Sequence, residues 1–325
     1  MTRGFVIGKF YPPHRGHSFL IETALANADA VTVAVCDHPS QLIPAALRAA
    51  WLREMHPAAA IIVVEDLGHD DDSAFWAGYT RLFLGFTPDI VFTSEDYGHT
   101  WAHHLGCRHV QVDKARVQVP VSGTAIRHNP YQHWQYIGPP VRAFFARRVC
   151  VLGAESTGST TLARALAAHF HTAWVPEVGR LYSEGKWTTA DASLWTTPEF
   201  TCIAETQNRL EDQLARLANR ILICDTNSFA TRLWHQRYTG ALSPEADALA
   251  AGRRYDLYLL TAPDIPFVQD GLRDGEHIRH AMHQRFVEEL DRLNTDWLLL
   301  TGTHEQRMAT AIPACQALLT RPFFP

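Results

Sequence analysis

Short runs of apolar residues alternate with amphipathic helical patterns along the whole chain. Helical patterns are clearest at residues 17–28, 44–55, 160–170 and 198–218. Strands that alternate with helices form βαβ units, so this pattern predicts an α/β protein with two doubly wound parallel sheets. The predicted strands lie at residues 4–10, 30–36, 61–64, 90–93 and 109–112 in the first half and at 148–153, 173–175, 221–224, 257–260 and 297–300 in the second.

The sequence Ile137-Gly-Pro-Pro-Val141 separates the two halves. Paired prolines end a helix and favour extended backbone, so we expect a joint at 137–147. The predicted domains are residues 1–140 and 147–325, and a chain of 325 residues is long enough to bury two separate cores.

Composition narrows the class of protein. A hydrophobic content of 46% with 19% charged residues excludes a disordered or collagen-like chain. A net charge of −5 gives no basic field for nucleic acid, and no apolar stretch has the roughly 18 residues of a membrane span. Six scattered cysteines without a CxxC pair are typical of a reducing compartment. Because a strand-like run follows Met1 directly, we expect no signal peptide and a cytoplasmic protein, with a homo-oligomer as an open option.

The first glycine-bearing turn reads Gly8-Lys-Phe-Tyr-Pro-Pro-His14-Arg-Gly16-His17. Open α/β sheets bind ligands beyond the carboxyl ends of their strands, where N–H groups at helix starts point outward. Two imidazoles at such a helix start are suitable donors to phosphate oxygens, and Gly16 is expected to allow a tight turn between them. In a chain with 18 histidines, a chance pair is the alternative.

A second set of polar residues lies more than a hundred positions downstream. Ser122-Gly-Thr124-Ala-Ile-Arg127 places two hydroxyls and a guanidinium at the start of another predicted helix. These groups are suited to bind a polyphosphate from the side opposite the two histidines.

The combination of GKFxPxHxGH with a later SGTxIR resembles the nucleotidylyltransferase superfamily. The intervening stretches are similar to the nicotinamide-mononucleotide adenylyltransferase half of the bifunctional NadR-type family. The resemblance implies a Rossmann-like domain that transfers the adenylyl group of ATP to nicotinamide mononucleotide (NMN), giving NAD and pyrophosphate with Mg²⁺.

The same resemblance implies roles for individual residues. His14 and His17 would stabilise the transferring α-phosphate, and Lys9 and Arg127 would neutralise the leaving pyrophosphate. Trp76 would stack near the nicotinamide of NMN, with Asp66 nearby, although a tryptophan beside Phe75 and Tyr79 also fits a place in the core. The remaining residues implied to bind ATP or phosphate here are Gly8, Phe10, Ser122 and Thr124.

The second glycine-bearing turn has the spacing of a Walker A loop, whose N–H groups cradle phosphates while its Ser/Thr binds Mg²⁺. Ser159 stands where the phosphate-binding lysine belongs, so the loop lacks its cation. An arginine or lysine from elsewhere (Arg164, Arg180, Lys186, Arg273 or Arg279) would have to replace it. Otherwise the loop binds nucleotide weakly or only supports the fold. The predicted phosphate-binding residues are Gly153, Glu155, Ser156, Thr157, Gly158, Ser159, Thr160 and Thr161.

Three further segments are similar to the ribosylnicotinamide kinase portion of the same family, which implies a P-loop kinase-like domain that phosphorylates nicotinamide riboside (NR) with ATP. Asp225 would hold Mg²⁺ together with Thr160, or activate the ribose 5′-hydroxyl; capping of the next helix is the alternative. Asn227 replaces a second acid of the family motif. The residues implied to bind the riboside or phosphates are Glu177, Arg180, Asp270 and Arg273, the last two within residues 269–274.

Two other functions fit the same motifs. One is a nucleotide-sensing protein that binds without turnover. The other is a nucleotidylyltransferase for a different phosphorylated acceptor, chosen by residues 66–79 with the acidic run Asp70-Asp71-Asp72. Some family members carry an N-terminal helix-turn-helix domain, and none is expected here because the first predicted strand begins at Gly4. The expected partners are therefore the small molecules ATP, NMN and NR, without nucleic acid or membrane.

Overall fold

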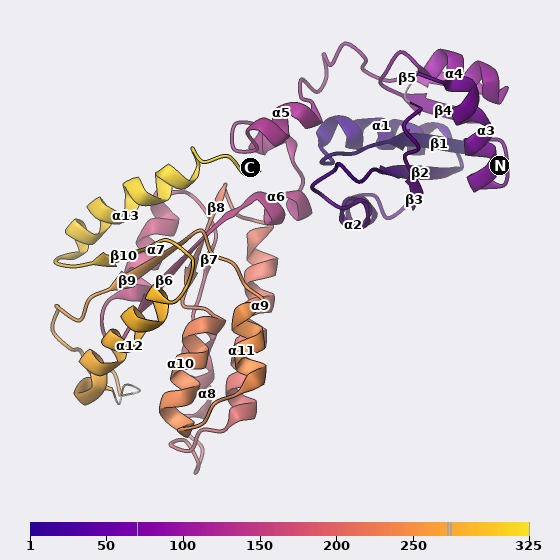
Figure 1. The fold of residues 1–325 in the computed structure, drawn as a ribbon. Helices are drawn as coiled ribbons and strands as arrows, with labels where there is room; N and C mark the ends of the chain where they lie inside the picture. Colours follow the sequence, from indigo (N-terminus) through magenta and orange to yellow (C-terminus); the bar gives the residue numbers. More distant parts are fainter. Residues whose placement is uncertain (70, 272, 274, 325) are drawn as a thin grey trace. The chain divides into compact units, whose positions relative to one another are not determined.

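The computed structural model describes residues 1–69, 71–271, 273 and 275–324. The chain divides into two compact units, Met1–Val141 with the C-terminal tail from Pro322 onward, and Arg142–Arg321. Each unit is built on one five-stranded sheet in which every strand pair is parallel (Figure 1). Within the described ranges, no helix combines the length and the apolar character needed to cross a membrane.

In the first unit, the strands are arranged in the order β3-β2-β1-β4-β5. The chain runs outward from β1 through β2 to β3 and then returns to the other side of β1 with β4. The sheet therefore reverses its winding between β1 and β4, where open α/β sheets bind ligands at the carboxyl ends of the strands. The strands are β1 (Arg3–Gly8), β2 (Ala30–Asp37), β3 (Ala60–Glu65), β4 (Ile90–Thr93) and β5 (Arg108–Gln111).

Alternate side chains of these strands enter two separate cores. Val6, Val33 and Val35 pack with the helices α1 (Arg15–Asn27) and α2 (Ala45–Met55). On the opposite face, the core contains residues from the helices α3 (Ser73–Leu84) and α4 (Gly98–Leu105) together with Phe5, Ile7 and Ala34. Both faces are covered, which explains why the strands read as nearly continuous apolar runs. The short helix α5 (Gly123–His128) and the 3₁₀ turn Trp134–Tyr136 follow β5.

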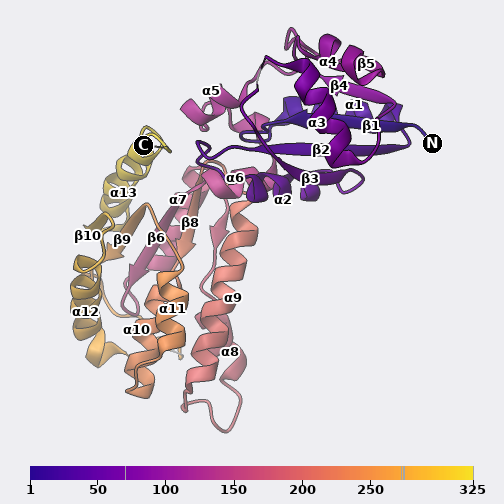
Figure 2. The same cartoon turned by 45° about the vertical axis from the view of Figure 1, so that its right-hand side comes forward.

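The second unit has the strand order β10-β9-β6-β8-β7, with β6 in the centre. Helices α7 (Ser159–His169) and α13 (His304–Leu318) pack on one face of the sheet. A group of neighbouring helices, α8 to α11, is visible in both views (Figures 1 and 2). The strands are β6 (Arg147–Gly153), β7 (Trp174–Val175), β8 (Ile221–Asp225), β9 (Leu257–Thr261) and β10 (Trp297–Leu300). The other helices are α8 (Val178–Lys186), α9 (Thr197–Ala215), α10 (Ser228–Thr239), α11 (Pro244–Ala251), the 3₁₀ turn Glu276–Ile278 and α12 (Arg279–Asp291).

The prediction of two parallel α/β sheets is confirmed, and the ten predicted strands lie within two residues of the observed ones. The prediction of extended backbone at the paired prolines is wrong. Pro139 and Pro140 begin the helix α6 (Pro139–Phe145), because proline is well tolerated in a first helical turn, where its missing N–H has no intrahelical partner.

Candidate active sites

The loop that follows β1 places two imidazoles against each other. His14 is the N-cap of α1, and its Nδ1 accepts a hydrogen bond from the backbone N–H of Gly16 at 3.1 Å. His17 lies in the first turn of the same helix, and the two rings stack with their centroids 3.7 Å apart. The ring of Phe10, which is buried, meets the His17 ring edge-on at 4.9 Å. The pair is therefore fixed by the helix start and by the core.

Both imidazoles are neutral near pH 7. Burial lowers the pKa of His14 to about 4, and the positive charge of Arg116 acts in the same direction. Burial is the main cause that lowers the pKa of His17 well below its usual value, and the neighbouring His14 acts in the same direction. Because His14 Nδ1 accepts a hydrogen bond, its proton is assigned to Nε2. His17 Nδ1 has no hydrogen-bond partner among the described residues, so the pair has polar atoms to offer a ligand.

Gly16 has a different role from the one predicted. It lies inside α1 and does not have a positive φ. A Cβ atom at this position would lie 3.0 Å from Cε1 of His14. A side chain here would press on the His14 ring, so Gly16 gives room to this ring and does not make a turn.

The Ser122–Arg127 motif meets the histidine loop at one residue, Tyr11. The Arg127 guanidinium donates to the Tyr11 carbonyl at 2.5 Å and lies 4.3 Å from the centre of the Tyr11 ring. A Cβ on Gly123 would come within 2.5 Å of the same carbonyl oxygen, so only glycine allows this approach of α5. Arg127 also donates to the Thr124 hydroxyl at 3.1 Å, and Ser122 caps α5.

A buried arginine supports the histidine loop from within the unit. Arg48 of α2 is fully buried and donates to the carbonyls of Lys9, Cys36 and Ile43. Its guanidinium also lies 5.5 Å from the centre of the Tyr11 ring. Tyr11 is thus contacted by one arginine of the core and one arginine of the site.

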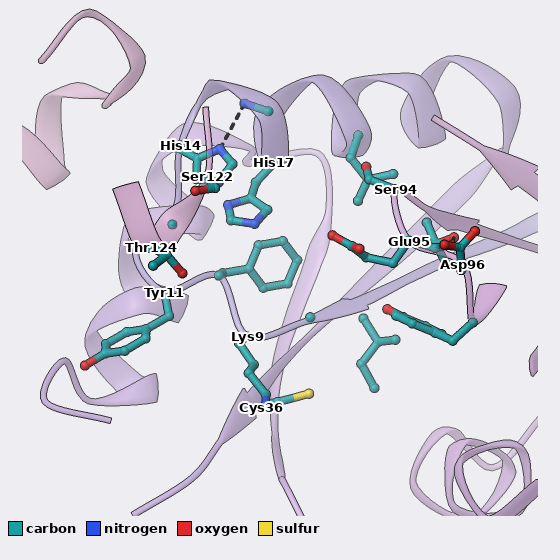
Figure 3. A pocket seen from close by; sticks show the side chains of 18 of the residues that line it. Lys9, Tyr11, His14, His17, Cys36, Ser94, Glu95, Asp96, Ser122 and Thr124 are labelled. Carbon is teal, nitrogen blue, oxygen red and sulfur yellow. Dashed lines mark hydrogen bonds between the residues drawn. The ribbon is translucent and has the colours of Figure 1, made fainter. Parts of the chain in front are cut away.

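These groups surround one cavity of about 710 Å³, a volume in the range of small-molecule sites. In Figure 3, His14, Ser122 and Thr124 lie on one side of it and Glu95 and Asp96 on the other. The cavity is lined by every residue predicted for this site, namely Gly8, Lys9, Phe10, His14, His17, Asp66, Trp76, Ser122, Thr124 and Arg127.

The two residues predicted to lie near NMN have protein partners already. The buried Asp66 carboxylate lies 3.7 Å from the Lys9 ammonium and accepts from the N–H of Gly68. Trp76 donates from its indole N–H to the His69 carbonyl at 2.8 Å, packs partly against the core and also lines the cavity. Asp70 of the predicted acidic run lies outside the described residues.

Sequence reasoning assigned no role in the site to the wall formed by Ser94, Glu95, Asp96 and Arg116. The first three directly follow β4, the strand beside β1 at the reversal of the sheet. Their position after a fully buried strand was a signal that could have identified them.

In the second unit, the segment predicted to be a phosphate loop connects β6 to α7. Gly158 has a φ of +80° and is the N-cap of α7, so the first N–H groups of the helix face the loop. A Cβ on Gly153 would overlap the hydroxyls of Thr157 and Thr261. Those two hydroxyls are 2.7 Å apart, and Thr157 also donates to the Ala154 carbonyl. Thr157 therefore holds the loop together and does not line the cavity.

Two carboxylates face the same loop. Asp225 at the end of β8 is bound by the Thr160 hydroxyl, and its Oδ2 is buried without a hydrogen-bond partner in the described ranges. Burial raises the pKa of Asp225 to about 6. Burial and the charge of Asp225 raise the pKa of Glu177 to about 7. A hydroxyl beside a buried, unpartnered carboxylate oxygen fits a Mg²⁺ ion whose other ligands are waters and phosphates.

The N-cap of α10 is Asn227, and Asp225 does not serve as this cap. Asn227 is fully buried, accepts from the Ala230 N–H at 3.0 Å and donates to the Tyr258 hydroxyl. This contact explains an amide at a position where an acid was expected.

A cavity of about 220 Å³ joins the loop to these carboxylates. Its lining contains Arg180 and Arg273, while Asp270 lies outside it and pairs with both arginines. The predicted residues that line the cavity are Gly153, Glu155, Ser156, Gly158, Ser159, Thr160, Thr161, Glu177, Arg180, Asp225 and Arg273. Sequence reasoning missed its aromatic wall, formed by Trp195, Phe200, Trp234 and Tyr238.

Comparison with known proteins places the chain in a family. A family model described as an AAA domain matches residues 148–307. The trifunctional NAD biosynthesis/regulator protein NadR of Escherichia coli (strain K12) is 30% identical in an alignment that covers 91% of this chain and 78% of that protein. The chain belongs to the NadR family. The NadR protein of Salmonella typhimurium (strain LT2) shows the same identity and the same coverage.

Solved NadR structures share the fold across both units. A crystal structure of NadR protein in complex with NR gives a TM-score of 0.77 at 22% identity and covers 97% of this chain and 95% of that chain. A second, of NadR protein in complex with NAD and AMP-PNP, gives 0.75 at 22% identity and covers 97% and 96%. NadR membership confirms the resemblance that the two sequence motifs carried.

Proposed function

We propose that the first unit transfers the adenylyl group of ATP to NMN, releasing NAD and pyrophosphate. The observation that carries this proposal is the single cavity lined by the stacked imidazoles of His14 and His17 and by Ser122, Thr124 and Arg127. Hydroxyl, guanidinium and imidazole donors around one volume match a triphosphate, and membership of the NadR family supports the same substrates.

In the proposed reaction, an NMN phosphate oxygen forms a bond to the α-phosphorus of ATP, and the bond to the bridging α–β oxygen breaks. Charge grows on the α-phosphate oxygens, where neutral imidazole N–H donors stabilise it. Lys9 and Arg127 neutralise the leaving pyrophosphate. Trp76 offers an aromatic face to the nicotinamide, and Asp66 orients Lys9.

The test supplies ATP, Mg²⁺ and NMN and resolves the products by mass spectrometry. NAD and pyrophosphate are expected in equal amounts, and His17→Ala is expected to abolish both while the chain stays folded. Binding of both nucleotides without product would identify a sensor. Product only from another phosphorylated pyridine nucleotide would identify a different acceptor.

We also propose that the second unit phosphorylates NR with ATP to give NMN. This proposal rests on the Walker A loop facing Asp225 and Glu177 across one cavity. The riboside O5′ forms a bond to the γ-phosphorus, the bond to the bridging β–γ oxygen breaks and ADP leaves. The hydroxyl proton passes to Glu177, whose pKa near 7 suits a proton acceptor. Thr160 and Asp225 would hold Mg²⁺, which would supply positive charge to the phosphates of ATP.

Formation of NMN is measured in the His17→Ala chain, because the active first unit would consume the product. NMN and ADP are expected from NR, ATP and Mg²⁺. Absence of NMN would show that the second unit either binds nucleotide without turnover or only supports the fold.

A further inference from the structure

The Walker A loop of the second unit, residues 153–161, contains no cation of its own. Its ionisable side chain is the Glu155 carboxylate, and Ser159 occupies the lysine position. Backbone N–H groups at the start of α7 remain available, but they do not supply the point charge that normally meets the β- and γ-phosphates. The positive charge must come from another segment.

Two arginines reach the loop only to support its backbone. Arg279 donates to the carbonyls of Ser156 at 2.8 Å and Ile265 at 2.9 Å. Arg307 donates to the carbonyls of Thr157 and Ala262. Both side chains are buried, and neither lines the cavity. Their guanidinium groups are therefore committed to the protein.

Three of the predicted replacements have partners outside the loop. Arg164 stacks over the Trp174 ring at 5.2 Å, and Lys186 pairs with Glu199 at 2.7 Å. Arg180 does line the cavity, but it comes from α8 and is bound by Asp270 and Glu184, two carboxylates outside the loop.

Arg273 differs from all of these because it both lines the cavity and contacts the loop. Its Nη1 lies 3.5 Å from the hydroxyl oxygen of Ser156. Its side chain is 25% exposed, and Nε lies 3.4 Å from the Asp270 carboxylate. Nη1 also donates to the Val268 carbonyl. The guanidinium is thus partly exposed and is held at the cavity by a carboxylate and a backbone carbonyl.

The segment that carries Arg273 is attached to the loop on both sides of it. Before it, the N–H of Val268 donates to the Ser156 hydroxyl at 2.8 Å. After it, the N–H of Gly275 donates to the Glu155 carboxylate at 2.7 Å. Arg273 is therefore anchored over the phosphate loop although it is 114 positions from Ser159 in the sequence.

We propose that Arg273 replaces the missing Walker A lysine by binding the β- and γ-phosphates of ATP. The inference rests on the kinase function proposed above. A guanidinium forms two charge-assisted hydrogen bonds to phosphate oxygens, so one side chain supplies both the charge and the orientation that the lysine provides elsewhere. Asp270 holds Arg273 at the cavity, and Arg180 remains for the riboside.

The test measures NMN formation from NR and ATP in the His17→Ala chain. Arg273→Ala is expected to lower kcat/KM for ATP by about 100-fold, the size of a lost charged hydrogen bond in a transition state. Arg273→Lys is expected to recover part of this loss. Arg164→Ala removes an arginine of the same unit that faces the Trp174 ring, and it is expected to leave kcat/KM unchanged.

The deciding variant is Ser159→Lys, which restores the cation in the loop. In its presence, Arg273→Ala is expected to cost less than about 5-fold, because the two cations serve the same phosphates. A segment that had merely loosened would not be rescued by a lysine elsewhere, so this readout separates phosphate binding from structural support.

Three results would overturn the assignment, and they differ in what else they reject. If the His17→Ala parent chain forms NMN and Arg273→Ala leaves its kcat/KM unchanged, the role of Arg273 is rejected but the kinase function is not. An equal loss of kcat/KM from Arg273→Ala with and without Ser159→Lys likewise rejects only the role of Arg273. If the parent makes no NMN and Ser159→Lys does, Arg273 does not replace the lysine, and the kinase function of the natural chain is rejected with it.

Discussion

The imidazole rings of His14 and His17 stack with their centroids 3.7 Å apart, and burial keeps both rings uncharged in the free protein. Two protonated rings at this separation would repel each other without solvent to screen them. The pair is therefore a neutral donor set that has to meet a negatively charged ligand before it can carry charge.

The stability of the first unit should depend on this pair in a defined pH range. The pKa of His14 falls from 6.5 to about 4 on folding, so the unfolded chain binds more protons between these values and stability is lost as the pH drops through them. For His14 alone the loss between pH 7 and pH 5 is about 2 kcal/mol. Denaturant unfolding of the wild type and His14→Gln at both pH values measures it. Equal pH dependence in the two chains would contradict the prediction.

The close approach of α5 to the histidine loop gives a second prediction. Gly123→Ala places a methyl group 2.5 Å from the Tyr11 carbonyl oxygen, the atom that Arg127 binds. Displacement of Arg127 is expected to lower NAD formation by about 100-fold. Gly78→Ala is the matched control, because a Cβ there meets nothing within 4 Å. Normal NAD formation by Gly123→Ala would show that α5 need not approach so closely.

Arg48 should matter for stability more than any exposed arginine of its helix. Arg48→Met leaves the carbonyls of Lys9, Cys36 and Ile43 without this donor inside the unit, and a loss of about 3 kcal/mol is expected. Arg53→Met removes one bond, to the Ile61 carbonyl, from an exposed side chain of α2 and should cost less than about 1 kcal/mol. Thermal or denaturant unfolding compares them, and similar losses would contradict this account of Arg48.

Asp225→Asn should separate the two proposed reactions. The substitution keeps the shape of a buried side chain but removes the charge beside the Thr160 hydroxyl. NMN formation from NR, measured in the His17→Ala chain, is expected to fall by at least about 100-fold. NAD formation from NMN, measured in the otherwise natural chain, should not change and serves as the control. Loss of both activities would indicate unfolding or a site assigned wrongly.

Much of the fold could be predicted because parallel strands covered on both faces are apolar throughout. Ile90–Thr93 and Trp297–Leu300 were predicted with their observed limits for this reason. The start of α1 was predicted too late, since His14 caps the helix through its side chain and the periodicity begins only after the cap. Pro139 and Pro140 were misread because a proline pair is compatible with both a helix end and a helix start.

The sites were predictable only where a local motif marks them. His14 and His17 are adjacent in sequence to a glycine-bearing turn, whereas Trp195 and Tyr238 of the second cavity come from separate segments and look like core residues. Thr157 has the right spacing for a phosphate ligand, but its hydroxyl is bound to the hydroxyl of Thr261 at the end of β9. Only tertiary structure reveals such long-range partners.

The two bonds that join Glu155 and Ser156 to the backbone at Gly275 and Val268 make the phosphate loop and its covering segment a single thermodynamic system. Lifting that segment breaks both bonds and carries Arg273 away from the loop. If a ligand binds only while the segment covers the loop, its binding stabilises the covered arrangement. By linkage, the covered arrangement strengthens ligand binding by the same free energy. Substitutions that weaken the attachment of this segment to the loop would therefore lower the apparent affinity for nucleotide, even when they lie far from any substrate.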